Sequence, residues 1–204
     1  SDTSYHSRGK QKLKRGGIWY TPQSGIWQTV WAECIPKDCV RSLHITSDFD
    51  HACVNVRADV VGESKAYALF DGQQYPLPAS IPVPGFEPWS PENPKLYDFS
   101  VICGADRVES YFAMRKFSVE ADENGVKRLF LNGKPYFHNG LLDQGYWSDG
   151  MYTAPSDEAL IFDIQTAKDM GFNMLRKHIK IEPLRWYYHC DRLGMLVWQD
   201  MING

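Results

Sequence analysis

The hydrophobic residues of this chain follow one period before about residue 119 and another after it. From Ile26 to Ile102, apolar and polar residues alternate in short runs, of which Val54–Val60 is the clearest. A two-residue period places alternate side chains on opposite faces of a strand, and short strands separated by turns predict a β-sandwich. Asp71-Gly72 is a hairpin-turn signal within this region. The seven prolines from Pro76 to Pro94 exclude a central strand and predict a rigid edge loop.

In the second region, strands alternate with helices. Asn132-Gly133 predicts a hairpin with a primed turn, and Ser156 followed by Asp157 and Glu158 predicts the start of a helix. The expected elements after this helix start are a helix end at Gly171, a buried strand at Asn173–Lys177, a second helix from Pro183 to Gly194 and a strand at Met195–Gln199.

Such an alternation implies right-handed crossovers and a parallel sheet. Three strands cannot close a barrel, and a parallel sheet is normally covered on both faces. The chain begins in a polar stretch and stops at Gly204 after a strand-like segment. We therefore expect both ends to be cuts, with more chain after Gly204 in the natural protein, and we expect this piece to self-associate through an open barrel edge.

The charge balance and the cysteines of the chain indicate which kinds of partner and which cellular compartment to expect. The chain has 22 Lys and Arg against 25 Asp and Glu, so it carries no electrostatic signature of nucleic-acid or membrane binding. No apolar run approaches the roughly 18 residues that span a bilayer. The basic run from Arg8 to Arg15 has the alternation of a solvated strand or tail. Five cysteines without a C-x-x-C pair favour a reducing, cytoplasmic compartment, although an export signal could lie outside this sequence.

Several motifs occur in an order that resembles glycoside hydrolase family 2. The motifs are Ser24-Gly25-Ile26-Trp27, the stretch Trp89–Tyr97 with Arg115, Asn132-Gly133-Lys134-Pro135, the run Asn173–Arg176, and Pro183–Trp198 with its LVWQD end at Asp200. The family contains β-galactosidases, β-mannosidases and β-glucuronidases, and the LVWQD run is most similar to the β-mannosidase branch.

The resemblance implies a multidomain β plus α/β chain. Residues 1–34 would end a jelly-roll sugar-binding domain, residues 35–118 would form an immunoglobulin-like β-sandwich, and residues 119–204 would supply the first three βα units of a (β/α)8 TIM barrel. It also implies a retaining exo-glycosidase acting on β-linked sugars. We expect no cofactor, and no metal, because the cysteines show no zinc-site spacing. The two catalytic glutamates would lie beyond Gly204, so this piece would be inactive alone.

Two departures from the family pattern fall at strand ends that would face the substrate. Lys177–Glu182 replaces the usual small residues followed by His-Tyr-Pro, and Leu142-Asp143-Gln144 stands where bacterial β-galactosidases carry Asn-Arg-His. Galactoside specificity therefore does not follow from the resemblance.

Candidate substrate-binding residues are those expected near the carboxyl ends of the strands, where barrel chemistry gathers. Arg176 is expected to orient a catalytic carboxylate or to form a structural salt bridge. His178 is expected to bind a sugar hydroxyl or to cap its strand. The other candidates are Asp143, Gln144 and Asp200 near strand ends, and Tyr146, Trp147 and Trp19, whose aromatic faces suit sugar rings.

Two alternatives remain open from the sequence. Asp143 and Asp200 could themselves form the carboxylate pair, which a retaining mechanism needs about 5 Å apart. The β-domain could also be a non-catalytic carbohydrate- or protein-binding module. A pure binding module would not require the strand and helix pattern after Pro135, so the sequence favours the enzyme.

Overall fold

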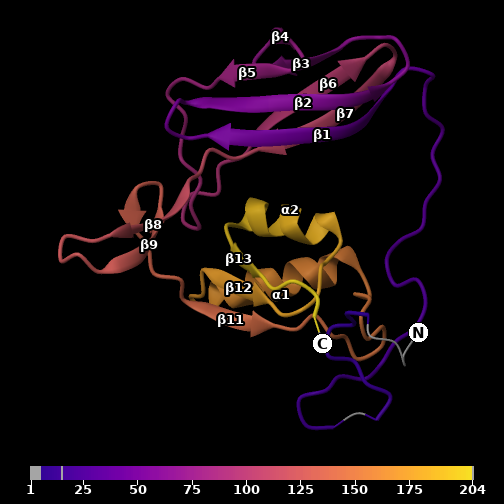
Figure 1. Ribbon diagram of the computed structural model, residues 1–204, viewed down its shortest axis with the longest axis vertical. Coiled ribbons are helices and arrows are strands. Elements are labelled where there is room, and N and C mark those ends of the chain that lie inside the picture. The colour runs from indigo at the N-terminus through magenta and orange to yellow at the C-terminus, as the bar shows by residue number, and fades with distance from the viewer. Residues whose placement is uncertain (1–5, 15, 204) are drawn as a thin grey trace. The chain divides into compact units, whose positions relative to one another are not determined.

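The computed structural model describes residues 6–14 and 16–203, and it forms two compact units (Figure 1). One unit is Ala32–Phe137, and the other combines the segment up to Trp31 with the residues from His138 onward. The described residues are mostly β, with two α-helices. Neither of these helices is long and apolar enough to cross a membrane.

The first unit contains two antiparallel sheets. One sheet has the order β1-β2-β5, with β1 at Cys39–Asp48, β2 at Cys53–Val61 and β5 at Ala79–Pro82. The other has the order β4-β3-β6-β7, with β4 at Gln73–Pro76, β3 at Ala66–Phe70, β6 at Tyr97–Cys103 and β7 at Asp106–Phe112.

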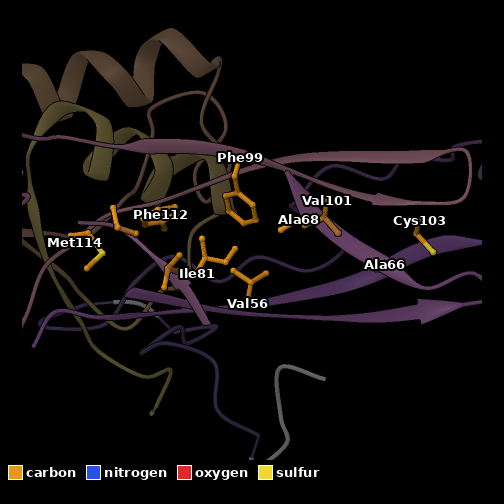
Figure 2. Packing of buried hydrophobic residues seen from close by; sticks show 11 residues of the cluster. Val56, Ala66, Ala68, Ile81, Phe99, Val101, Cys103, Phe112 and Met114 are labelled. Atoms are coloured by element: carbon orange, nitrogen blue, oxygen red, sulfur yellow. The ribbon is translucent and has the colours of Figure 1, made fainter. Parts of the chain in front are cut away.

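One hydrophobic core is shared by the two sheets. Val56 and Ile81 come from the first sheet, and Val101 and Phe112 come from the second; all four are buried in the same cluster (Figure 2). The sheets therefore pack face to face, which is the arrangement predicted from the alternation of apolar residues. The alternation weakens at the end of β2, where Val60 is exposed.

The proline-rich stretch contains one short strand. β5 pairs with β2 alone among the described strands, so it lies at a sheet edge. Pro82 ends this strand, in keeping with the restriction of proline to sheet edges and strand ends. The expected absence of a central strand holds, but the stretch is not entirely loop.

A small sheet of order β10-β9-β8 completes the first unit. Its strands are β8 (Phe117–Ala121), β9 (Lys127–Leu131) and β10 (Lys134–Pro135). Asn132 and Gly133 between β9 and β10 have φ values of 53° and 76°. Two successive positive φ values define the predicted primed turn, which Asn-Gly adopts at low cost.

The second unit contains a parallel sheet and two helices in strand–helix order. The elements are β11 (Gly140–Asp143), α1 (Asp157–Asp169), β12 (Met174–Lys177), α2 (Leu184–Leu193) and β13 (Leu196–Gln199), with sheet order β11-β12-β13. The Ser156 side chain accepts a hydrogen bond from the Ala159 N–H, as expected for the predicted N-cap. Gly194 ends α2 in the left-handed conformation.

One face of the parallel sheet packs against the helices. Leu175 of β12 shares a buried cluster with Leu160 and Ile164 of α1 and with Trp186 of α2. The sheet register places Leu142, Arg176 and Trp198 on the opposite face. Leu142 and Trp198 are exposed there, so the described residues cover this sheet on one side only.

Phe112 is expected to dominate the sandwich core, because its ring contacts those of Phe70, Tyr97 and Phe99. Replacing Phe112 with alanine should lower the free energy of unfolding by about 3–5 kcal/mol in a denaturant titration. Phe117→Ala is the control, since Phe117 is 54% exposed and should cost about 1 kcal/mol or less. Equal effects of the two substitutions would contradict the assigned core.

Candidate functional site

The carboxyl ends of the three parallel strands bring most of the predicted site residues together. Asp143, Lys177 and Gln199 end β11, β12 and β13 and lie side by side in the sheet register. Parallel strands end at a common edge, and in open α/β sheets and barrels this edge carries the ligand site. The polar groups at this edge are therefore the candidate functional site.

Arg176 and Asp200 form a two-contact ion pair at this edge. The Arg176 Nε donates to Asp200 Oδ1 at 3.1 Å, and Nη2 lies 3.0 Å from Oδ2. The Asp200 N–H donates to the Lys177 carbonyl at 3.0 Å, which fixes the carboxylate that orients the arginine. About half of the Arg176 side chain is exposed, so the pair contributes little stability but leaves guanidinium donors accessible.

His178 follows β12 and contacts the N-terminal segment of the same unit. Its Nδ1 lies 2.9 Å from the Tyr20 hydroxyl, and the two rings meet edge to face. Burial lowers the pKa of His178, and the positive charge of Lys10 lowers it further. The ring is thus favoured in its neutral form, which has one nitrogen that accepts and one that donates a hydrogen bond.

A cluster of four charged residues lies beneath this surface. We call Asp143, Lys177, Lys180 and Glu182 the buried charge cluster. Lys177 Nζ lies 2.8 Å from Asp143 Oδ2 and 3.0 Å from Glu182 Oε1, and Lys180 Nζ lies 2.8 Å from the same glutamate oxygen. The side chains of both lysines are 1% exposed and that of Glu182 is 2% exposed. Two cations therefore face two anions, as burial of charge requires.

Aromatic rings surround the lysines of the cluster. Lys177 Nζ lies 4.3 Å from the centre of the Trp186 ring, and Lys180 Nζ lies 4.8 Å from Tyr152 and 5.1 Å from Trp27. Burial lowers the pKa of Lys180, while the Glu182 carboxylate acts in the opposite direction. The ring faces add cation–π attraction to the ion pairs.

Gly145 closes the cluster from the loop after β11. Its carbonyl accepts a hydrogen bond from Lys180 Nζ at 2.6 Å, and its φ is +64°. A methyl group here would lie 2.5 Å from Glu182 Oε1 and 2.9 Å from Lys180 Nζ. Both the backbone conformation and the space therefore require glycine.

The remaining predicted residues lie in different surroundings. Gln144 hydrogen-bonds the Tyr20 side chain. The Tyr146 ring packs against Tyr20 at 5.0 Å, and its buried hydroxyl has no hydrogen-bond partner among residues 6–14 and 16–203. Trp147 packs against the core between sheet and helices, and Trp19 lies under the Lys12 ammonium at 3.5 Å.

The ion-pair partners were not anticipated from the sequence. The sequence marks Lys177, Lys180 and Glu182 only as part of a departure from the family pattern, and no pattern in it points to Tyr152. A signal was present, because Lys180 and Glu182 alternate with apolar residues directly after a buried strand. Charged residues in that position need counterions close by.

Comparison with curated proteins finds similar glycosidases. No protein-family model matches the chain. The chain is 26% identical to a β-galactosidase of Streptococcus thermophilus over 194 residues, which cover 85% of this chain and 19% of that protein. It is 27% identical to a β-galactosidase of Photobacterium profundum over 229 residues, covering 97% and 21%. The chain thus spans about a fifth of the length of these relatives.

Solved structures of glycosidases have a fold similar to that of this chain. A GH2 β-galacturonidase of Eisenbergiella tayi, bound to galacturonate, aligns with a TM-score of 0.70 and 20% identity over 83% of this chain and 33% of that one. A β-glucuronidase of Faecalibacterium prausnitzii aligns with a TM-score of 0.70 and 21% identity over 79% and 28%. Together the two comparisons confirm the resemblance to glycosidases of family 2.

Gly145→Ala is expected to lower the free energy of unfolding by about 2–4 kcal/mol, because it combines backbone strain with a collision inside the buried charge cluster. Gly171→Ala is the matched control in the same unit, since Gly171 also has a positive φ, +88°, but has open space around its Cβ position. Denaturant titrations of both variants measure the difference. A loss at position 145 no larger than at position 171 would mean that the cluster tolerates the methyl group.

Proposed function

We propose that this chain, as a relative of family 2 glycoside hydrolases, is part of a retaining exo-glycosidase that hydrolyses β-linked sugars. The observation that carries the proposal is the Arg176–Asp200 ion pair, held at the carboxyl edge of a parallel strand–helix sheet. A fixed guanidinium at this edge can bind a sugar oxygen or hold a catalytic carboxylate ionised. The substrate class is a carbohydrate.

The finer architecture is part of the same proposal. The two-sheet unit corresponds to an immunoglobulin-like sandwich, and β11, β12 and β13 correspond to the strands of the first three βα units of a TIM barrel. Among the described residues, α1 and α2 supply the helices of the first two units, and the third unit is represented by its strand. Residues 1–34 would then end a jelly-roll domain, residues 35–118 would form the sandwich domain, and residues 119–204 would begin the catalytic domain. The strand order β11-β12-β13 supports this, because consecutive strands of a TIM barrel are neighbours.

The catalytic carboxylates are proposed to lie outside residues 1–204. Retaining enzymes need a free nucleophile and an acid/base group about 5 Å apart. Asp143 is bound to the buried Lys177, and both oxygens of Asp200 are bound by Arg176. Two carboxylates that are each neutralised by a fixed cation suit positioning better than nucleophilic attack. This disfavours the Asp143 and Asp200 pair.

The residues of this chain would then bind and orient the sugar. Arg176 offers charge-assisted hydrogen bonds, and neutral His178 offers one donor or acceptor to a hydroxyl. Gln144 and Tyr146 flank Tyr20 and would shape the loop beside His178. Trp147 lies against the helix core and would support the site rather than stack on a sugar.

A binding module is the second candidate function. A groove of about 650 Å³ in the sandwich unit is lined by Phe70, Tyr75 and Tyr97 together with Gln73 and Asp98. Half-buried rings beside polar side chains suit a sugar. This reading leaves the Arg176–Asp200 pair without a role, so the glycosidase is favoured.

The first experiment is hydrolysis of a panel of nitrophenyl glycosides. We expect no turnover by residues 1–204 and turnover of one β-glycoside by a longer polypeptide of the same gene that includes the complete barrel, because both glutamates would be supplied only there. Activity in the short chain would instead assign the carboxylate pair to Asp143 and Asp200. Absence of activity in both would leave the binding module.

Arg176→Lys in the active longer polypeptide should lower kcat/KM by about 100-fold, because lysine cannot reproduce the paired contacts to Asp200. Arg57→Lys is the control, since Arg57 also lies beside an exposed aspartate, Asp59, at 3.9 Å but in the sandwich unit. Steady-state kinetics of both variants measure the effect. An unchanged kcat/KM for Arg176→Lys would remove the guanidinium from the mechanism.

Self-association of residues 1–204 is expected, because β11 and β13 each pair only with β12 among the described strands and so expose unpaired backbone groups. Exposed Leu142 and Trp198 on the uncovered sheet face add an apolar contribution. Sedimentation velocity should detect species larger than the 23.4 kDa chain at micromolar concentration. A clean monomer across the concentration range would contradict the expectation.

A further inference from the structure

We propose that Lys177, Lys180 and Glu182 are positioning residues, which hold His178 at the carboxyl edge of the sheet so that its ring can contact the sugar. The contact with a sugar rests on the proposed glycosidase function. The positioning itself rests on the geometry of the buried charge cluster alone, and it can be measured without a substrate.

The cluster joins the chain segments that follow two neighbouring strands. Asp143 and Gly145 come from the end of β11 and its loop, whereas Lys177, Lys180 and Glu182 come from the end of β12 and its loop. Lys177 contacts Asp143, and Lys180 donates to the Gly145 carbonyl. The single Glu182 oxygen Oε1 accepts from both lysines. Neither loop can move without separating buried opposite charges.

His178 lies between the two anchored lysines. Its own N–H donates to the Asp143 carbonyl at 2.8 Å, and the Lys180 carbonyl accepts from Gln199 Nε2 of β13 at 2.9 Å. The backbone around His178 is therefore tied to all three strands. Only two residues separate Lys177 from Lys180, so this segment has little slack.

Backbone strain at Ile179 supports the same conclusion. Ile179 has a φ of +48° and is 3% exposed, although a β-branched residue disfavours positive φ. Strain of this kind persists only where the surroundings over-determine the conformation, and it gathers at functional sites. Here the neighbours Lys177 and Lys180 supply the constraint, and the strained residue directly follows His178.

Stability alone does not account for the cluster. Burying four charged groups costs desolvation free energy, and well-packed apolar residues in place of a buried ion pair are often as stable or more stable. If the cluster served stability alone, apolar residues could replace it without changing the conformation of the loop after β12. A cluster retained for positioning could not be replaced in this way.

The N-terminal segment completes the arrangement. Tyr20 contacts the His178 ring, and Trp27 covers Lys180 while its carbonyl accepts from the Thr153 hydroxyl at 2.7 Å. The segment therefore meets both the positioned ring and the cluster that positions it. The Tyr20 hydroxyl sets which way the ring faces, and the cluster sets where its backbone lies.

The test is the charge-balanced double variant Lys180→Met/Glu182→Leu in residues 1–204. It removes one cation and one anion and leaves the Lys177–Asp143 pair. We expect an unfolding midpoint equal to or above that of the parent chain, amide hydrogen exchange of residues 178–181 faster by about tenfold, and ring-nitrogen NMR shifts of His178 that no longer report a single tautomer.

Lys116→Met/Asp50→Asn is the matched control. It removes a lysine and a carboxylate joined by an exposed ion pair in the other unit, with the same change of charge. It should leave the His178 signals and the exchange of residues 178–181 as they are. Unchanged exchange and unchanged His178 shifts in the cluster variant would overturn the proposal.

Glu182→Gln is the second variant, and it applies if the double variant fails to fold. It keeps the size of the side chain and an acceptor for both lysines and removes only the charge, so the same two NMR readouts decide in the same way. In the longer polypeptide, the double variant should lower kcat/KM about tenfold at an unchanged unfolding midpoint. Altered NMR signals in residues 1–204, together with no glycosidase activity in the unsubstituted longer polypeptide, would reject the proposed function and keep the positioning role.

Discussion

The buried ammonium group of Lys177 is the constraint on which the α/β unit depends. It ends the central strand of a three-stranded sheet, it is 1% exposed, and it lies over the face of Trp186. A charge in this position must meet a counterion, since its hydration has been removed. Asp143 supplies one counterion from the neighbouring strand, and Glu182 supplies another from the following loop. The conformations of both loops follow from this requirement.

The two units are held together by different physical means. In the sandwich, the alternation of apolar residues places Val56 and Val101 in one core, whose described members are hydrophobic residues. In the α/β unit, the same hydrophobic packing operates between Leu175 and Trp186, but polar interactions take over at the carboxyl edge of the strands. This division matches the general separation of a stabilising scaffold from a site built on strand ends.

Local signals in the sequence predicted much of the fold. Alternation predicted the sandwich strands, and Asn132-Gly133 predicted a turn with positive φ at both residues. Ser156 was predicted as an N-cap, and its side chain accepts a hydrogen bond from the Ala159 N–H. These features depend on neighbours within a few residues. The strand within the proline-rich stretch was not predicted, because its formation depends on pairing with β2, whose paired residues lie 23–29 positions earlier in the chain.

The candidate site was only partly predictable for the same reason. The rule that parallel strands share an edge brought Arg176 and Asp200 into consideration, and the two side chains meet although they lie 24 positions apart in the chain. No local pattern could pair Tyr20 with His178, since they lie 158 positions apart, nor could it show that Lys177 and Lys180 share one oxygen of Glu182. The apolar residues alternating with these charges were consistent with burial, but burial of charge becomes interpretable only when the counterions are known.

The charges at the strand edge divide into two layers with different consequences. Arg176 and Asp200 are partly exposed, so water can compete for the guanidinium. The buried charge cluster is closed to such competition, because the side chains of its lysines are 1% exposed and separating them from their counterions would leave a charge uncompensated. The exposed ion pair can adjust its hydrogen bonds, whereas the buried cluster beneath it keeps its geometry. A site that orients a ligand requires this combination. His178 joins the two layers, since its backbone is fixed by the cluster while its ring remains beside Tyr20 at the surface of the site.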